Sequence, residues 1–363
     1  MKRWPATDAM RRLGLRLPIV QGPFGGGLSS VELTTAVSDA GGLGSFGAHH
    51  LDAAGIDDTA SAIRARSAGP FALNLWVPFE DSEAPDVDDE QFARYVALLQ
   101  PYFDELGVPA PQRPARYMPR FDEQVDAVLA ARPAVFSFVF GIPPEDVLRR
   151  CRDLSITTLG AATTPDEAVA LAQAGVDMIV ATGFEAGGHR VSFLRPAEES
   201  LTGTFALVPQ VVDAVDCPVI AAGGIGDGRG LVAAMALGAQ AVQIGTAFLA
   251  CSESNASDVH RRRLFSGDAR HTALTRAFSG RLARGIRNRL MDELADHATE
   301  LAPYPVQNWL TGRFKSEAVA QDRPDLMSLW SGQAAPLLRE RNAAALITHL
   351  MAQAQAVAAR MGA

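Results

Sequence analysis

The chain has 363 residues, 48% of them hydrophobic, and carries a formal net charge of −8 with an isoelectric point near 5.4. This length accommodates two ordinary domains or one barrel with additions. The acidic balance disfavours a protein that binds nucleic acid or an anionic membrane, because both partners require a positive protein surface. A small-molecule partner is therefore favoured.

The three cysteines, Cys151, Cys217 and Cys251, are widely spaced and form no Cys-x-x-Cys pattern. They suggest neither a disulfide framework nor a thiolate metal site. The N-terminus lacks an apolar signal region, and no later run approaches the ~18 apolar residues of a spanning helix. We expect a cytoplasmic protein that is not embedded in a membrane.

Short apolar runs alternate with amphipathic helical stretches, which is the pattern of a parallel sheet covered by helices. Helices are expected over 31–37, 57–67, 205–215 and 227–237, and from residues 144 and 164 onward. About eight strands precede residue 250, the number that closes a (β/α)8 barrel. An open doubly wound sheet is the alternative, but the first strand is not followed by the Gly-x-Gly-x-x-Gly turn of dinucleotide folds. The expected strands are 17–20, 43–46, 71–75, 135–140, 155–159, 178–180, 219–222 and 241–244.

Two segments break this alternation. Residues 77–125 contain an acidic run and several prolines, which indicates either a solvated insertion or a lid beside the active site. Residues 251–363 are charged and helical in pattern, with helices expected over 285–297 and 333–360. The sequence thus predicts an α/β protein: a (β/α)8 TIM barrel over 1–250, an insertion after the third strand, and a helical C-terminal extension over 251–363 that packs on the barrel.

Glycines follow the seventh and eighth expected strands, where barrels often bind phosphate. Gly223 and Gly224 open a helix, and Gly245 and Thr246 stand just after Gln243 in the next strand. Backbone N–H groups at such turns can hold a phosphate without lysine. Tight turns without a ligand are the simpler interpretation of either pair alone, but the two pairs together favour a phosphate site.

His189 follows Gly187 and Gly188 after the sixth expected strand. The two glycines allow the backbone to approach a planar ligand, and imidazole is well matched to proton transfer near neutral pH. A loop histidine is often merely solvated, and Asn74 at the end of the third strand is equally explained as a turn residue. No motif of a phosphate-binding loop, zinc protease or serine hydrolase occurs, so a bound cofactor is expected to carry the chemistry.

These segments resemble the class I nitronate monooxygenases, formerly called 2-nitropropane dioxygenases, over nearly the whole chain. The matching pieces are 18–23, 40–45, Asn74, 185–190, 221–225, 243–248, 278–281, 283–285 and 304–307. The resemblance implies an FMN enzyme that oxidises alkyl nitronates, and as a further class nitroalkanes, with O₂ to a carbonyl compound and nitrite. It implies His189 as catalytic base. The cofactor-binding residues it implies are Gly22, Pro23, Phe24, Asn74, Thr182, Gly187, Gly188, Gly223, Gly224, Gln243, Gly245 and Thr246.

Three positions depart from the family pattern and leave the substrate open. Phe24 stands where methionine is common in the family, and Thr182 stands where a flavin-contacting glutamine is usual. Val139 stands where many members have histidine. The alternative activity is an NAD(P)H-dependent FMN reductase acting on a quinone or an enoyl thioester, and a non-enzymatic flavin-binding protein is a third interpretation. A homodimer is compatible with the sequence.

Overall fold

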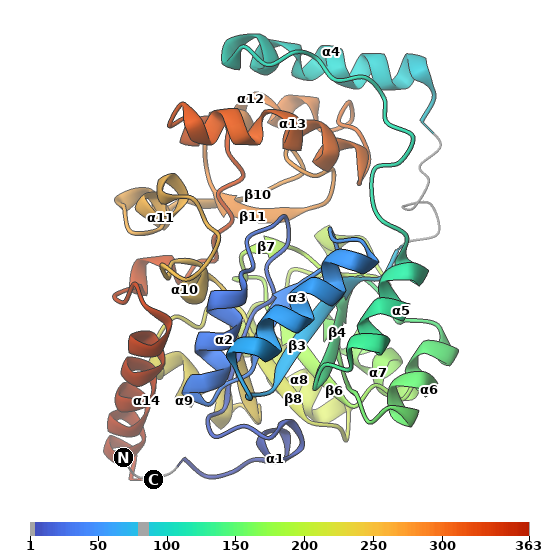
Figure 1. The fold of residues 1–363 in the computed structure, drawn as a ribbon. Coiled ribbons are helices and arrows are strands. Elements are labelled where there is room, and N and C mark those ends of the chain that lie inside the picture. The colour runs from blue at the N-terminus through green and yellow to red at the C-terminus, as the bar shows by residue number, and fades with distance from the viewer. Residues whose placement is uncertain (1–3, 79–86, 363) are drawn as a thin grey trace.

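The computed structural model describes residues 4–78 and 87–362, and its centre is a barrel of parallel strands (Figure 1). The strands follow the order β1-β9-β8-β6-β5-β4-β3-β2, and a bridge between Val20 and Leu43 joins the two ends. All eight expected strands are present, which confirms the predicted fold class. They are β1 (Ile19–Gln21), β2 (Gly44–Gly47), β3 (Phe71–Trp76), β4 (Val135–Val139), β5 (Thr157–Ala162), β6 (Met178–Thr182), β8 (Val219–Ala222) and β9 (Ala241–Ile244).

Helices cover the outside of the barrel and begin where local capping dictates. The Thr164 side chain accepts a hydrogen bond from the amide of Glu167, and the Asp227 carboxylate accepts from the amides of Arg229 and Gly230. These starts confirm the helices expected from residues 164 and 227. Besides α1 (Asp8–Leu13), the helices are α2 (Val31–Ala40), α3 (Ala53–Arg66), α5 (Phe121–Ala131), α6 (Glu145–Asp153), α7 (Pro165–Gln173), α8 (Thr204–Ala214) and α9 (Gly228–Ala236).

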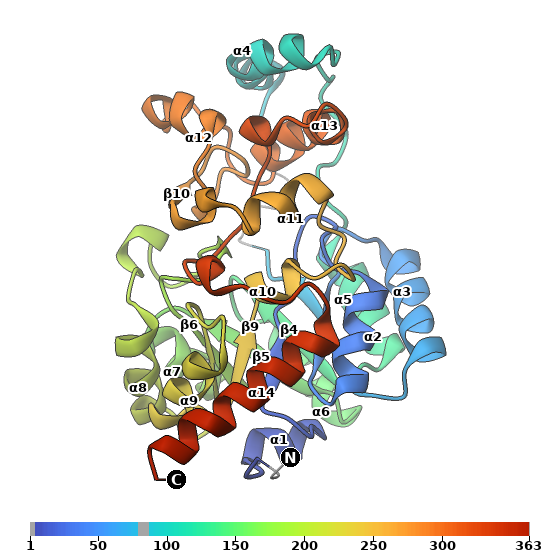
Figure 2. The same ribbon diagram turned by 90° about the vertical axis from the view of Figure 1, so that its left-hand side faces the viewer.

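The last helix of the chain takes the eighth position around the barrel. After β9 only the short α10 (Thr246–Leu249) follows, and α14 (Ala343–Arg360) packs against α9 and α2 (Figure 2). A Cβ added at Gly228 would collide with backbone atoms of α14, so glycine permits the close approach of α9 and α14. The prediction that this helix starts at residue 333 was wrong, because residues 331–342 turn toward the carboxyl ends of the strands before the helix begins.

A second layer, which we call the cap, consists of α4 (Asp89–Leu106) and residues 258–330. It lies over the carboxyl ends of the strands (Figure 1). A three-stranded sheet, β10 (Thr272–Thr275), β11 (Ala283–Ile286) and β7 (Gly188–His189), connects the cap to the loop after β6. The C-terminal extension is mainly helical and in addition contains the strands β10 and β11. The helix expected from residue 285 begins only at Arg289, because β11 pairs with both β7 and β10. The cap helices are α11 (Asp258–Leu264), α12 (Arg289–Glu293) and α13 (Val306–Ala320).

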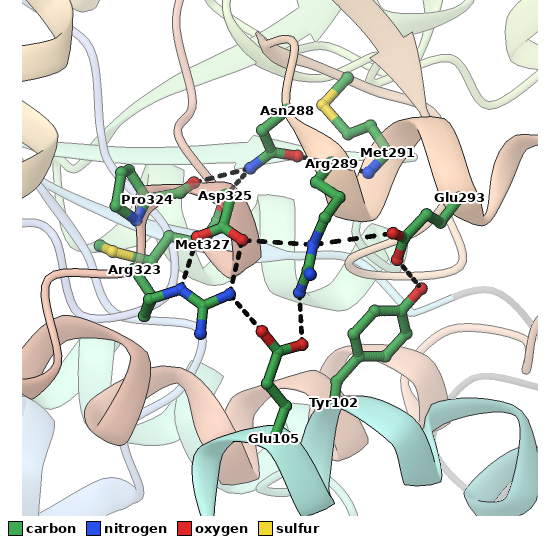
Figure 3. Close-up of polar contacts among 10 residues, drawn as sticks. All are labelled: Tyr102, Glu105, Asn288, Arg289, Met291, Glu293, Arg323, Pro324, Asp325 and Met327. Carbon is green, nitrogen blue, oxygen red and sulfur yellow. Dashed lines mark hydrogen bonds and ion pairs between the residues drawn. The ribbon is translucent and has the colours of Figure 1, made fainter.

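Within the cap, α4 of the insertion after β3 packs against α13. The Phe103 ring is fully buried and meets the Phe314 ring of α13 edge-on, with centroids 5.3 Å apart. Beside it, Glu105 forms ion pairs with Arg289 and Arg323, both at 2.5 Å (Figure 3). Part of the acidic run, Glu80, Asp81, Glu83 and Asp86, lies outside the described residues. Among the described residues, no helix combines the length and apolar character needed to cross a bilayer.

The aromatic contact is expected to hold α4 more strongly than the ion pairs. Phe103→Ala should lower the free energy of unfolding by about 3–5 kcal/mol, because it leaves a buried cavity. Glu105→Gln should cost about 1 kcal/mol or less, since the carboxylate is partly exposed and screened by water. Urea denaturation of both variants, with Glu90→Gln as an exposed control on the same helix, measures the difference. A larger loss for Glu105→Gln than for Phe103→Ala would contradict this ranking.

Candidate functional site

A cavity of about 410 Å³ lies between the carboxyl ends of the barrel strands and the cap. Its volume falls within the usual range of small-molecule sites. Every site residue expected from the sequence lines it, including His189 and Asn74. The structure thus brings together side chains and turns that lie at the carboxyl ends of β1, β3, β6, β8 and β9 or just after them. Their roles remain predictions. The remaining lining residues of the expected set are Gly22, Pro23, Phe24, Thr182, Gly187, Gly188, Gly223, Gly224, Gln243, Gly245 and Thr246.

The glycine turns form a cradle with unused backbone donors. A Cβ added at Gly245 would meet only the Phe24 ring, at 4.0 Å, and one added at Gly188 would meet nothing within 4 Å. The amides of Gly224 and Gly245 have no hydrogen-bond acceptor in the described part of the chain. Gly245 is half-buried and Gly224 is exposed, so both amides are accessible and could donate to the acceptor oxygens of a ligand at this end of the cavity.

Residues after the barrel close one side of this cradle, which the sequence did not indicate. The amide of Gly332 donates to the Thr246 hydroxyl at 2.9 Å, and the amide of Gln333 donates to the Glu185 carbonyl at 2.9 Å. A Cβ at Gly187 would collide with the backbone of Ser331 and Gly332. Gly187 therefore serves close packing of two chain segments in addition to lining the cavity.

A buried arginine fixes the loop between β6 and β7. The Arg190 guanidinium is only 2% exposed and donates to the carbonyls of Thr182, Gly183 and Ser200. Burial lowers its pKa to about 10, partly offset by the carboxylate of Glu167. Arg190 therefore remains a cation at neutral pH and holds the residues on either side of the loop in place, which positions His189.

His189 is held at the cavity wall by a hydroxyl and by aromatic rings. Its Nε2 lies 2.8 Å from the Ser279 Oγ, which itself donates to the Arg281 carbonyl at 3.1 Å. The Ser279 oxygen therefore accepts from Nε2–H, and Nδ1 is left as the basic nitrogen. The Trp76 and Trp330 rings lie 5.0 and 5.5 Å from the imidazole. Burial, and then the charge of Arg281, lower the His189 pKa to about 3.

Two further lining residues, His49 and Lys315, escaped sequence reasoning. The His49 ring stacks on Trp76 with centroids 3.9 Å apart, although the pair His49–His50 carried no recognisable motif. The Lys315 ammonium enters the cavity from α13 and lies 3.4 Å from the Gly26 carbonyl, and burial lowers its pKa. Lys315 reaches the cavity only because the cap covers the barrel, so no local pattern could have revealed it. His49 instead follows β2 at the carboxyl edge of the barrel, where the topological argument used for His189 applies to it as well.

The buried imidazoles are expected to make the fold acid-sensitive. Burial is the largest cause that lowers the pKa of His189 to about 3 and of His260 to about 4, below the ordinary value of 6.5. Below pH 6.5 these histidines therefore bind protons in the unfolded chain but not in the folded chain. The free energy of unfolding should decrease as the pH falls below about 6.5 and level off near the folded-state pKa values of about 3 and 4. His260→Gln keeps a donor for the Trp330 carbonyl and should reduce the slope by about 1.4 kcal/mol per pH unit. Denaturation from pH 7 to 4 tests this, and an unchanged slope would contradict it.

Comparison with known proteins agrees with the fold. The family model described as nitronate monooxygenase matches residues 8–353. A probable nitronate monooxygenase of Staphylococcus aureus strain MSSA476 is 37% identical over 351 residues, covering 96% of this chain and 98% of the relative.

Two solved structures also share the architecture. Nitroalkane oxidase from Streptomyces ansochromogenes is 35% identical, with a TM-score of 0.86 and coverage of 98% of this chain and 100% of that one. FabK from Thermotoga maritima is 26% identical, with a TM-score of 0.77 and 99% coverage of each chain. The family model and the relatives agree along nearly the whole length, so the protein is an oxidoreductase and the chain belongs to the nitronate monooxygenase family.

Proposed function

We propose that the cavity binds FMN and that the protein oxidises alkyl nitronates with O₂ to a carbonyl compound and nitrite. The single observation that carries this proposal is the glycine cradle beside His189, with backbone donors at Gly224 and Gly245 that have no acceptor among the described residues. A flavin phosphate would supply the missing acceptors, and a planar ring system fits a wall where glycines leave open space.

Different groups of residues would contact different parts of the cofactor. The turns at Gly223–Gly224 and Gly245–Thr246 would hold the phosphate, with Gln243 and Gly187 toward the ribityl chain. Gly22 to Phe24, Asn74, Thr182 and Gly188 would flank the ring system. When bound, FMN would supply the redox chemistry that couples oxidation of the nitronate to reduction of O₂.

His189 would act as base when the substrate is a neutral nitroalkane. Nδ1 takes the proton from the α-carbon, and the electrons of that C–H bond remain on the substrate as the nitronate. Ser279 keeps the ring oriented through Nε2 during this transfer. The negative charge that develops on the nitronate stabilises the imidazolium and raises its pKa during the step. A substrate supplied as the nitronate skips this step and needs only orientation.

The three departures from the family pattern concern the same cavity. Phe24, Val139 and Thr182 all line it. They replace flexible or polar side chains by an aromatic, a branched aliphatic and a short hydroxyl residue. We therefore expect this pocket to differ from the pockets of its relatives in the shape of the substrate that it accepts, and not in the cofactor that it binds.

The proposed activity is tested by mixing the purified yellow protein with an alkyl nitronate in air, without NAD(P)H. Nitrite should accumulate together with the carbonyl compound. A second candidate, an NAD(P)H-dependent reductase of a quinone or enoyl thioester, is favoured by the likeness to FabK. Rapid anaerobic bleaching of the flavin by NADH or NADPH, with no nitrite from the nitronate, would select the reductase and overturn the proposal.

A further inference from the structure

Three aromatic rings pack against the imidazole of His189. The centroids of the Trp76, Trp330 and Phe140 rings lie 5.0, 5.5 and 6.1 Å from the imidazole centroid. Trp76 at the end of β3 and Trp330 at the end of the cap also line the cavity, whereas Phe140 does not. Because Nε2 is bonded to the Ser279 hydroxyl, a substrate approaches the free Nδ1 along the surfaces of the two indole rings.

The indole on the barrel side has little room to move. The His49 ring stacks on Trp76 with a centroid distance of 3.9 Å and an angle of 4° between the planes. A Cβ added at Gly25 would lie 3.0 Å from Cζ2 of Trp76. Phe140 meets Trp76 edge-on at 5.1 Å from a backbone with φ 70°, a left-handed conformation that bulky residues rarely adopt. Such strained backbone persists where the surrounding packing enforces it, and it is frequent at functional sites.

The indole on the cap side is held as firmly. The backbone of Trp330 forms a bridge with Gly285 of β11, and its carbonyl accepts a hydrogen bond from Nε2 of His260 at 3.0 Å. The Phe278 ring meets the indole edge-on at 5.7 Å, and a Cβ added at Gly285 would lie 3.4 Å from Cε3 of Trp330. Trp330 is half-buried, so the part of the ring that the cap leaves open faces the cavity.

Two fixed indole walls discriminate between substrates by shape at the α-carbon. A primary nitroalkane has one carbon substituent on this atom, and a secondary nitroalkane has two. When the α-carbon approaches Nδ1, the second substituent must lie against one of the indole rings. A single methylene group in a well-packed apolar pocket changes kcat/KM by about 10–200-fold.

We propose that Trp330, together with Trp76, makes the site selective for primary nitroalkanes and primary nitronates over secondary ones. The nature of the reacting group rests on the proposed function. The selection by shape depends on the two indole rings, which line the cavity whatever reaction takes place there. Trp330 is therefore a specificity-determining residue that the cap brings to the barrel.

The isomers 1-nitropropane and 2-nitropropane, each also supplied as its nitronate, test the proposal by nitrite production. The measured quantity is the ratio of kcat/KM for the primary to the secondary isomer, and comparing this ratio between variants cancels the intrinsic reactivity of the two compounds. Trp330→Phe keeps an aromatic ring against Phe278 but removes part of the wall, so the ratio should fall roughly tenfold. Trp309→Phe is the matched control, because Trp309 packs on Phe92 and Tyr117 and does not line the cavity. Its ratio should equal that of the wild type.

A binding measurement without turnover separates this proposal from the proposed reaction. Butanoate and 2-methylpropanoate have the carbon skeletons of the two nitropropanes, with an unreactive carboxylate in place of the nitro group. Titration of the flavin-loaded wild-type protein, which requires no variant to fold, should show butanoate binding roughly tenfold more tightly. Equal affinities, binding of neither carboxylate, or a ratio of kcat/KM that is unchanged in Trp330→Phe would overturn the proposal. Selective binding of butanoate by a protein that makes no nitrite would reject only the proposed reaction.

Discussion

Replacing His189 by asparagine is expected to lower kcat/KM for a neutral nitroalkane by roughly 10²–10⁴-fold, the usual contribution of a positioned general base. Asparagine retains a polar group but cannot accept the proton. A nitronate that is already ionised needs no deprotonation, so its kcat/KM should fall far less. Steady-state nitrite production from both substrate forms, at equal flavin content, measures the contrast.

The variant Ser279→Ala distinguishes the effect of losing the base from the effect of losing the group that orients it. It leaves the imidazole in place but removes the hydroxyl that accepts from Nε2. Nitroalkane turnover should therefore decline by less than in His189→Asn. As in that variant, turnover of the neutral nitroalkane should fall more than turnover of the nitronate. Equal losses on nitroalkane and nitronate in His189→Asn would remove the general-base role and leave only binding or orientation.

A leucine at Gly245 is expected to give a folded protein with little or no flavin. The backbone there has φ −98°, which any residue adopts, and an added Cβ meets only Phe24 at 4.0 Å. The larger side chain would therefore occupy the cradle instead of disturbing the barrel. FMN affinity should fall roughly 10- to 100-fold or more, equivalent to the 1–3 kcal/mol usually lost by overpacking.

Flavin absorbance per mole of protein and the thermal midpoint of the apoprotein check this expectation. Gly267→Leu is a suitable control, because Gly267 also has open space around it but does not line the cavity. It should stay yellow and equally stable. A Gly245→Leu protein with normal flavin content would show that the phosphate lies elsewhere.

The barrel and its cradle were predictable because their signals are local. A strand buried on both faces appears as an uninterrupted apolar run, and each run here ends in a turn that the topology directs to the same edge of the barrel. Gly223 and Gly245 could thus be assigned to one site from strands that are adjacent only in space. His189 followed from the same argument, since it stands after β6 at that edge.

The cap was less predictable because its structure depends on partners distant in sequence. β7 has only two residues, Gly188 and His189, and exists because β11 offers an edge to pair with. The residues of β11 also overlap the charged stretch 285–297, whose pattern predicts a helix. Lys315 becomes part of the site only through contacts between the cap and the barrel, which no periodicity encodes.

The place of α14 has a consequence for how the protein is made. The barrel strands are complete by Ile244, yet the helix that fills the space between α9 and α2 is the last one in the chain. During synthesis, the ribosome must therefore release the cap and residues up to Arg360 before the helices of the first and last β/α units can be covered. Until then the surfaces of α2 and α9 that α14 covers stay open to water, so the unfinished chain remains exposed to aggregation there after all eight barrel strands have been made.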